Sequence, residues 1–201
     1  MDRFSGDRPS RYRSLKVNAM NIMEWGSAMS SREPQARIER HTIAVLVDNE
    51  AGVLARVIGL FAGRGYNIDS LTVTEVSHEA GESRITIVTT GSVEIIDQIK
   101  SQLGRLVPVH AVTDLTVKGD PIERELALVK VAGKGEKRVE SLRLAEAFRA
   151  SVVDATTDHF VFEITGRVSK IDNFIALMKP LGLVEVARTG VAAIARGPDA
   201  M

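Results

Sequence analysis

The chain has 201 residues, of which 44% are hydrophobic and 26% charged, proportions that exclude a wholly disordered chain, a collagen or a disulfide scaffold. Its 26 Lys and Arg balance its 26 Asp and Glu, and a net charge of zero is unlike that of proteins that bind duplex nucleic acid. The absence of cysteine excludes disulfides, thiolate nucleophiles and the usual zinc sites, and no apolar run approaches the roughly 20 residues that cross a membrane. The length allows one large domain or two small ones.

Residues 1–38 differ from the rest of the chain, because they lack apolar periodicity and are rich in arginine and methionine. Four of the six methionines fall here: Met1, Met20, Met23 and Met29. We predict that this segment is a disordered N-terminal extension. Two other interpretations stay open: an organelle-targeting peptide, against which Asp2, Asp7 and Glu24 count, and a start codon placed too far upstream.

Residues 39–118 show a regular succession of strand-like and helix-like patterns in the order β-α-β-β-α-β. The strands show continuous or alternating apolar residues, and the helices show apolar residues three and four positions apart. This spacing predicts strands at 43–47, 68–76, 84–90 and 109–117, and helices at 53–61 and 95–103. The expected apolar face of the first helix consists of Val53, Leu54, Val57, Ile58, Leu60 and Phe61. Gly63 and Gly65 suit the end of this helix, where a left-handed residue is common.

The same order of elements recurs after Gly119-Asp120-Pro121, a predicted linker. Strands are expected at 126–131, 152–155 and 160–164, with a closing strand at 183–194, and helices at 136–150 and 171–178. The residues expected to face inward from the helix at 136–150 are Val139, Leu142, Ala145 and Phe148.

The predicted fold class is α+β, with two ferredoxin-like βαββαβ units, each a four-stranded antiparallel sheet and two helices. The predicted domains are residues 39–118 and 119–201. A unit of roughly 75–80 residues buries a thin core and leaves its sheet edges exposed. Edge-to-edge pairing with a second copy covers such an edge, so we expect a homodimer.

The side chains form no recognisable catalytic or metal-binding pattern. No serine lies in a nucleophile-elbow sequence, and the four histidines are scattered without partners at metal-ligand spacing. The stretch 133–137 superficially resembles a phosphate loop but lacks the GxxxxGK[ST] spacing, so it is interpreted as a strand-to-helix turn. RNA-recognition modules share the ferredoxin-like order, yet the predicted central strand at 84–90 carries no aromatic residue on which a base would stack. We expect no catalytic residue, no metal, no nucleic acid and no membrane partner.

The first strand–turn–helix is the most informative segment. Asn49 precedes the predicted helix and has the side chain to cap it, and Gly52 lets a ligand approach the backbone. A helix N-terminus suits a small carboxylate, and Asn67 beside Ile68 offers another amide next to an apolar wall. These residues are suited to an amino acid. Taken by themselves, they are explained at least as well by a helix cap, a packing glycine and a turn asparagine.

Two runs carry a family resemblance: DNEAGVLARV at 48–57 and RGYNIDSLTV at 64–73. They resemble an ACT domain and, more narrowly, the regulatory small subunit of acetolactate synthase. The closing segment VEVARTGV at 184–191, followed by Arg196-Gly197, is similar to the C-terminal end of that family. The similarity covers about residues 40–197, and the extension before it departs from the compact bacterial form.

The resemblance implies an N-terminal ACT domain, a C-terminal ACT-like domain and a non-catalytic role. It implies a large catalytic subunit as partner, which carries thiamine diphosphate, magnesium and FAD, and a bacterial, cytoplasmic location. In the family, valine binds between the ACT domains of two subunits and inhibits the enzyme. The matching effector positions here are Asn49, Gly52, Val53, Leu54, Asn67 and Ile68. Two rival functions stay open: an amino-acid-sensing module that regulates another enzyme, and an enzyme in its own right.

Overall fold

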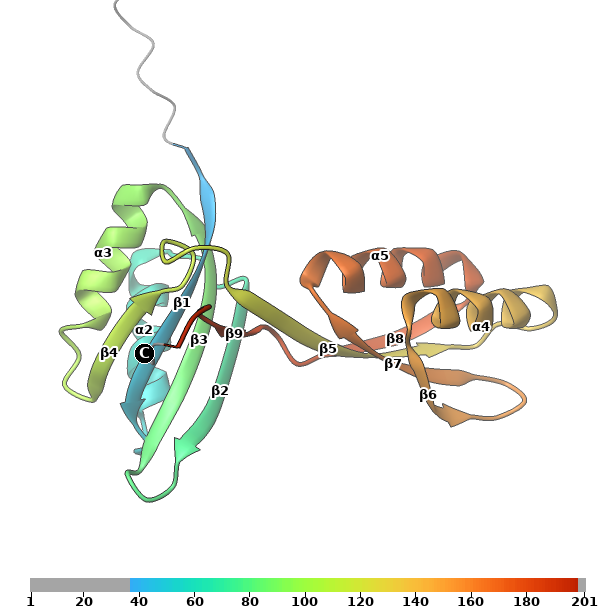
Figure 1. The fold of residues 1–201 in the computed structure, drawn as a ribbon, viewed down its shortest axis with the longest axis horizontal. Helices are drawn as coiled ribbons and strands as arrows, with labels where there is room; N and C mark the ends of the chain where they lie inside the picture. The colour runs from blue at the N-terminus through green and yellow to red at the C-terminus, as the bar shows by residue number, and fades with distance from the viewer. Residues whose placement is uncertain (1–36, 199–201) are drawn as a thin grey trace, which may run out of the picture. The chain divides into compact units, whose positions relative to one another are not determined.

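A computed structural model describes residues 37–198 of the chain. The predicted extension at 1–38 therefore lies almost wholly outside the described residues. The described chain forms two α+β sandwiches, in which two helices cover one face of each antiparallel sheet (Figure 1). This confirms the predicted fold class. The domain limits at 39–118 and 119–201, and the homodimer, stay predictions.

The first sandwich has strand order β2-β3-β1-β4. Its elements are β1 (Glu39–Asp48), α2 (Val53–Arg64), β2 (Ser70–Ser77), β3 (Glu82–Gly91), α3 (Val93–Leu103) and β4 (Val109–Asp114). Alternate residues of β1 face the helices, because successive side chains of a strand point to opposite faces. These residues join a core that includes Ile43, Val45, Val57, Phe61, Ile87 and Ile99.

The first helix ends where its glycines predict. Gly65 has φ 69° and forms the left-handed C-cap of α2. The apolar face of this helix is narrower than predicted, because Val53, Val57 and Phe61 are buried while Leu54 and Ile58 are each 38% exposed. The fourth strand is also shorter than predicted. It ends at Asp114, and Val117 is 72% exposed.

The second sandwich repeats this order with β6-β7-β5-β8. Its elements are β5 (Ile122–Val131), α4 (Glu136–Phe148), β6 (Ser151–Ala155), β7 (Phe160–Gly166), α5 (Val168–Met178), the short 3-10 helix η1 (Lys179–Leu181) and β8 (Leu183–Arg188). Its core includes Val129, Phe162, Ile171, Phe174 and Met178.

The predicted inward face of α4 is wrong at Val139, which is 50% exposed. The fully buried positions of this helix are Ser141 and Ala145, four residues apart. Small side chains on this stripe let the helix backbone come close to its neighbours, and the Ser141 hydroxyl donates to the Arg138 carbonyl at 2.8 Å. The other three residues predicted to face inward, Leu142, Ala145 and Phe148, belong to the core or pack against it, so the prediction fails at Val139 alone.

The single closing strand predicted at 183–194 is also wrong, because the segment divides into β8 and a separate strand β9 (Ala192–Ile194). The chain breaks at Gly190, whose φ is 81°. β8 pairs with the second half of β5, whereas β9 pairs with residues Ile122–Arg124 at its start. We call residues 189–194 the strap.

The strap covers the face of the first sheet that lies opposite its helices. Val191 and Ala193 form a third apolar cluster with Ala44, Val88 and Leu115. Arg84 of β3 also donates from Nη2 to the Ala193 carbonyl at 2.7 Å. Burial beneath the strap lowers the pKa of Arg84.

Candidate functional site

The turn between β1 and α2 forms one half of the predicted effector site. Asn49 follows the last residue of β1 and is held by its backbone N–H, which donates to the Gly81 carbonyl at 2.6 Å. The expectation that Asn49 caps the helix is wrong, because Gly52 is the N-cap and no side chain bonds to the helix end. Asn49 lies one turn too early in the chain, and its side chain is exposed.

The backbone conformation at position 52 favours glycine, and the space beside Gly52 is open. Its φ is 87°, in the left-handed region that favours glycine. A Cβ built at Gly52 would meet no heavy atom of the described residues within 4 Å. The two following residues differ: the Val53 side chain is 3% exposed and belongs to the core, while Leu54 is 38% exposed. Of this pair, only Leu54 can offer its side chain to a ligand.

Asn67 and Ile68 form the other half, immediately before β2. The Asn67 Nδ2 donates to Asp69 Oδ1 at 2.5 Å, and Thr90 Oγ1 donates to Asp69 Oδ2 at 2.7 Å. A carboxylate only accepts hydrogen bonds, so the amide nitrogen of Asn67 faces Asp69 and its Oδ1 faces away. Asp69 and Thr90 were not among the predicted site residues. The Asn-x-Asp spacing was the available signal, because it puts a side-chain amide donor two residues from a carboxylate acceptor.

The two halves lie at opposite ends of the first sheet. Thr89 donates to the Asn67 carbonyl and pairs with His41, so Asn67 is level with the start of β1. Asn49 follows the end of β1, eight residues later, which at roughly 3.3 Å per residue is a separation of about 25 Å. A single chain therefore does not bring the predicted effector residues together.

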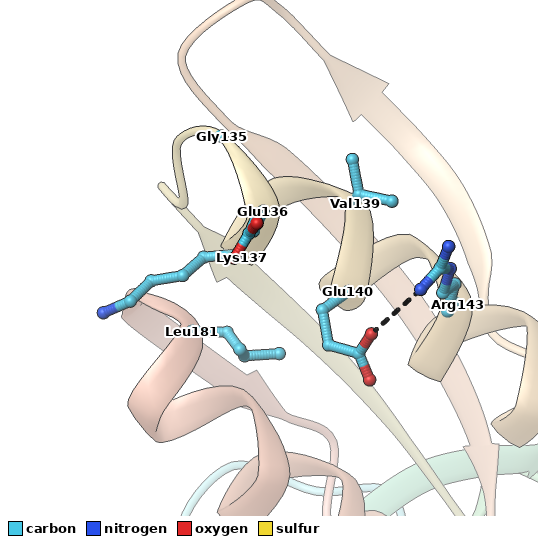
Figure 2. A pocket seen from close by; sticks show the side chains of 7 residues that line it. All are labelled: Gly135, Glu136, Lys137, Val139, Glu140, Arg143 and Leu181. Atoms are coloured by element: carbon cyan, nitrogen blue, oxygen red, sulfur yellow. Dashed lines mark ion pairs between the residues drawn. The ribbon is translucent and has the colours of Figure 1, made fainter.

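A hollow of about 770 Å³ lies elsewhere, at the start of α4 (Figure 2). Its lining residues are Gly135, Glu136, Lys137, Val139, Glu140, Arg143 and Leu181. Arg143 and Glu140, three residues apart on α4, form an ion pair at 3.7 Å. A Cβ on nearby Gly133 would lie 2.6 Å from the Leu181 carbonyl oxygen, so the backbone of η1 packs directly against the turn that contains Gly133. Residues 133–135 connect β5 to α4, as predicted, and the hollow contains none of the predicted effector residues.

Within residues 37–198, no three His, Cys, Asp or Glu side chains are placed to hold a metal ion. The helices of the same range include none that is long and apolar enough to cross a membrane.

Comparison with known proteins identifies the class first. Residues 43–111 match the family model described as an AHAS small subunit-like ACT domain. This match includes parts of all four strands of the first sheet and the open turn at Gly52, so the chain is an ACT-domain protein. Residues 124–197 match a second family model, described as the small subunit of acetolactate synthase.

Relatives that match about 80% of the chain narrow the class to one family. The chain is 46% identical to the acetolactate synthase small subunit of Aquifex aeolicus, over 81% of this chain and 84% of that protein. It is 42% identical to the isozyme 3 small subunit of Escherichia coli K12, over 81% of this chain and 99% of that one. The crystal structure of the small subunit from Thermotoga maritima superposes with a TM-score of 0.73 at 39% identity, covering 80% of this chain and 99% of that one. The chain belongs to the family of acetolactate synthase small regulatory subunits.

Proposed function

We propose that this chain binds the large catalytic subunit of acetolactate synthase, raises its activity and makes it sensitive to valine. The complex condenses two pyruvate molecules to 2-acetolactate and CO2 in branched-chain amino acid synthesis. Thiamine diphosphate, magnesium and FAD belong to the large subunit in this proposal. The main support is the pair of half-sites at Gly52 and Asn67, whose chemistry suits one amino acid and whose separation requires two copies of the chain.

Pairing of two copies through β2 joins the half-sites. β2 is the edge of its sheet, so one side of its backbone is open for pairing. Edge strands that pair across a two-fold axis perpendicular to the sheet run antiparallel, so the start of one β2 lies beside the end of the other. Ser77 and Asp48 both pair with Glu82, which places the end of β2 at the same end of the sheet as Gly52. Each of the two sites then receives Gly52 from one copy and Asn67 from the other.

The joined site suits an α-amino acid with a short aliphatic side chain. The N-terminus of α2 has no side-chain cap, and its partial positive charge favours a carboxylate. Oδ1 of Asn67 is an acceptor for the ammonium group, since Asp69 holds the amide nitrogen on the other side. Leu54 and Ile68 supply apolar walls.

Inhibition requires valine to distinguish two states of the complex. A ligand with equal affinity for the active and the inactive state does not change the equilibrium between them. A coupling free energy of about 1–3 kcal/mol, or roughly 5- to 150-fold in affinity, is sufficient for regulation.

The proposal is tested with the reconstituted complex of large and small subunits. We expect Asn67→Ala to keep the activation but to weaken inhibition by valine about tenfold or more, because a hydrogen bond to a charged group contributes about 1.5–3 kcal/mol. Asn173→Ala, at an exposed position of α5, is the matched control and should behave as the wild type. Unchanged valine inhibition in Asn67→Ala would contradict the site assignment.

Gly52 provides an independent test of the carboxylate pocket. Gly52→Asp and Gly52→Ala share the strain of a side chain at φ 87°, but only aspartate adds a negative charge where the carboxylate of valine would bind. We expect valine to raise the unfolding temperature of the alanine variant more than that of the aspartate variant. An equal increase in the unfolding temperature of both variants would mean that the carboxylate of valine binds elsewhere.

A further inference from the structure

The strap attaches directly to the strand that follows one half of the proposed effector site. Ser70 Oγ accepts a hydrogen bond from the Val191 N–H at 2.9 Å, and Thr72 Oγ1 donates to the Val191 carbonyl at 3.0 Å. Ser70 is only two residues after Ile68 in the chain. The beginning of β2 is thus bonded to the strap through both the N–H and the carbonyl of Val191.

The strap also lies too close to β2 for an intervening side chain. A Cβ on Gly190 would lie 2.8 Å from Ser70 Oγ and 3.0 Å from Thr72 Cγ2. Below this contact the Val191 side chain is 2% exposed and packs in the third apolar cluster. Close packing of this kind transmits displacements, because protein interiors are not compressible.

The other end of the strap is fixed to the second sandwich. Thr189 and Leu126 bond reciprocally, with Thr189 N–H to the Leu126 carbonyl at 3.0 Å and Leu126 N–H to Thr189 Oγ1 at 3.1 Å. The preceding residue, Arg188, holds Glu125 and Asp172 by three hydrogen bonds. Gly190 is the single residue between Thr189, which is bonded to the second sandwich, and Val191, which is bonded to β2.

We propose that the strap carries the effect of valine from β2 to the second sandwich, with Ser70 and Thr72 as the coupling residues. This inference rests on the proposed function. If valine draws the start of β2 toward the partner copy, Val191 either follows or loses both hydrogen bonds. Because only Gly190 lies between Val191 and Thr189, the chain cannot absorb a displacement of Val191 there. The displacement therefore reaches Thr189 and β5. Coupling is reciprocal, so contact of the second sandwich with the catalytic subunit changes valine affinity through the same residues.

The test separates valine binding from valine inhibition in a Ser70→Ala/Thr72→Val variant. Both substitutions remove hydroxyl partners of Val191 and leave the six predicted effector residues intact. Thr74→Val is the matched control, because Thr74 lies on the same face of β2 and, among residues 37–198, its hydroxyl bonds only to the adjacent Glu75 carbonyl, at 3.4 Å. Valine binding is measured by calorimetry on the small subunit, and activation and inhibition on the reconstituted complex.

We expect the double variant to activate normally and to bind valine within about threefold of the wild type, while the maximal inhibition by saturating valine falls by at least about half. The control should keep full inhibition. Full inhibition of the double variant at saturating valine would overturn the role of the strap. A wild-type complex that valine does not inhibit would instead refute the proposed function, and this inference with it.

Hydrogen exchange of the wild-type chain gives a second readout that does not depend on any variant. Valine should change the protection of the Val191 amide and of residues 186–189, not only that of residues 49–52 and 67–70. A change confined to the two half-sites would overturn the proposal, even if the double variant unfolds.

Discussion

The ion pair between Arg188 and Glu125 permits a quantitative prediction about the second sandwich. Arg188 donates from Nε to Glu125 Oε1 at 2.8 Å and from Nη2 to Oε2 at 2.6 Å, so the two planar groups bond in parallel. The Glu125 side chain is 5% exposed and that of Arg188 is 35% exposed. Arg188→Met removes both of these bonds and the exposed one to Asp172, and it leaves the buried carboxylate of Glu125 without its partner.

The expected loss is about 2 kcal/mol in the free energy of unfolding. Breaking a fully buried pair costs about 3–5 kcal/mol, and the partial exposure of Arg188 lets water replace some of that interaction. Hydrogen bonds to Glu125 raise the pKa of Arg188, so the guanidinium keeps its charge at alkaline pH. The loss should therefore be equal at pH 7 and pH 9.

Urea unfolding followed by circular dichroism measures this loss. Arg188→Met/Glu125→Met should recover to within about 1 kcal/mol of the wild type, because the uncompensated charge is removed as well. Arg143→Met is the control: its ion pair with Glu140 is exposed, and the change should be below about 0.5 kcal/mol. The reasoning is refuted if Arg188→Met is as stable as the wild type, or if the double variant is no more stable than the single one.

Two glycine substitutions should shift the thermal midpoint in opposite directions. Gly133→Ala should destabilise by about 2 kcal/mol or more, because its Cβ would lie 2.6 Å from the backbone oxygen of Leu181 and the turn would have to move. Gly59→Ala should stabilise by about 0.5–1 kcal/mol, since Gly59 lies on the exposed face of α2 with nothing described within 4 Å of its Cβ. A destabilised Gly59→Ala, or a Gly133→Ala with an unchanged midpoint, would contradict the packing described around these two glycines.

The spacing of apolar residues along the chain was sufficient to predict helices that bury one dominant apolar stripe. In α5, the helix predicted at 171–178, residues Ile171, Phe174 and Met178 recur at helical spacing and are fully buried. In α4 the same rule was right for Leu142, Ala145 and Phe148, which belong to the core or pack against it, but it was wrong for Val139. It also missed Ser141, which is fully buried. A helix rotates to fit its neighbours, and single-sequence periodicity contains no information about the neighbours' shape.

The candidate site was predictable residue by residue but not in its arrangement. Asn67 and Gly52 were selected from the sequence, yet Asp69, which orients the Asn67 amide, was not. The role of Asn49 as a helix cap was wrong because Gly52 adopts a left-handed conformation and begins the helix itself.

The sequence by itself determined the two βαββαβ units, the glycine that ends α2 and the family to which the chain belongs, because these depend on residues that are near one another in the chain. Only the tertiary structure decided that the half-sites lie at opposite ends of one sheet, and that the closing segment leaves its own sheet to cover the first. Both depend on pairing between distant residues, such as Ser70 and Val191, which are 121 positions apart. No local pattern specifies such a contact, since its free energy comes from surfaces that exist only after both sandwiches have formed.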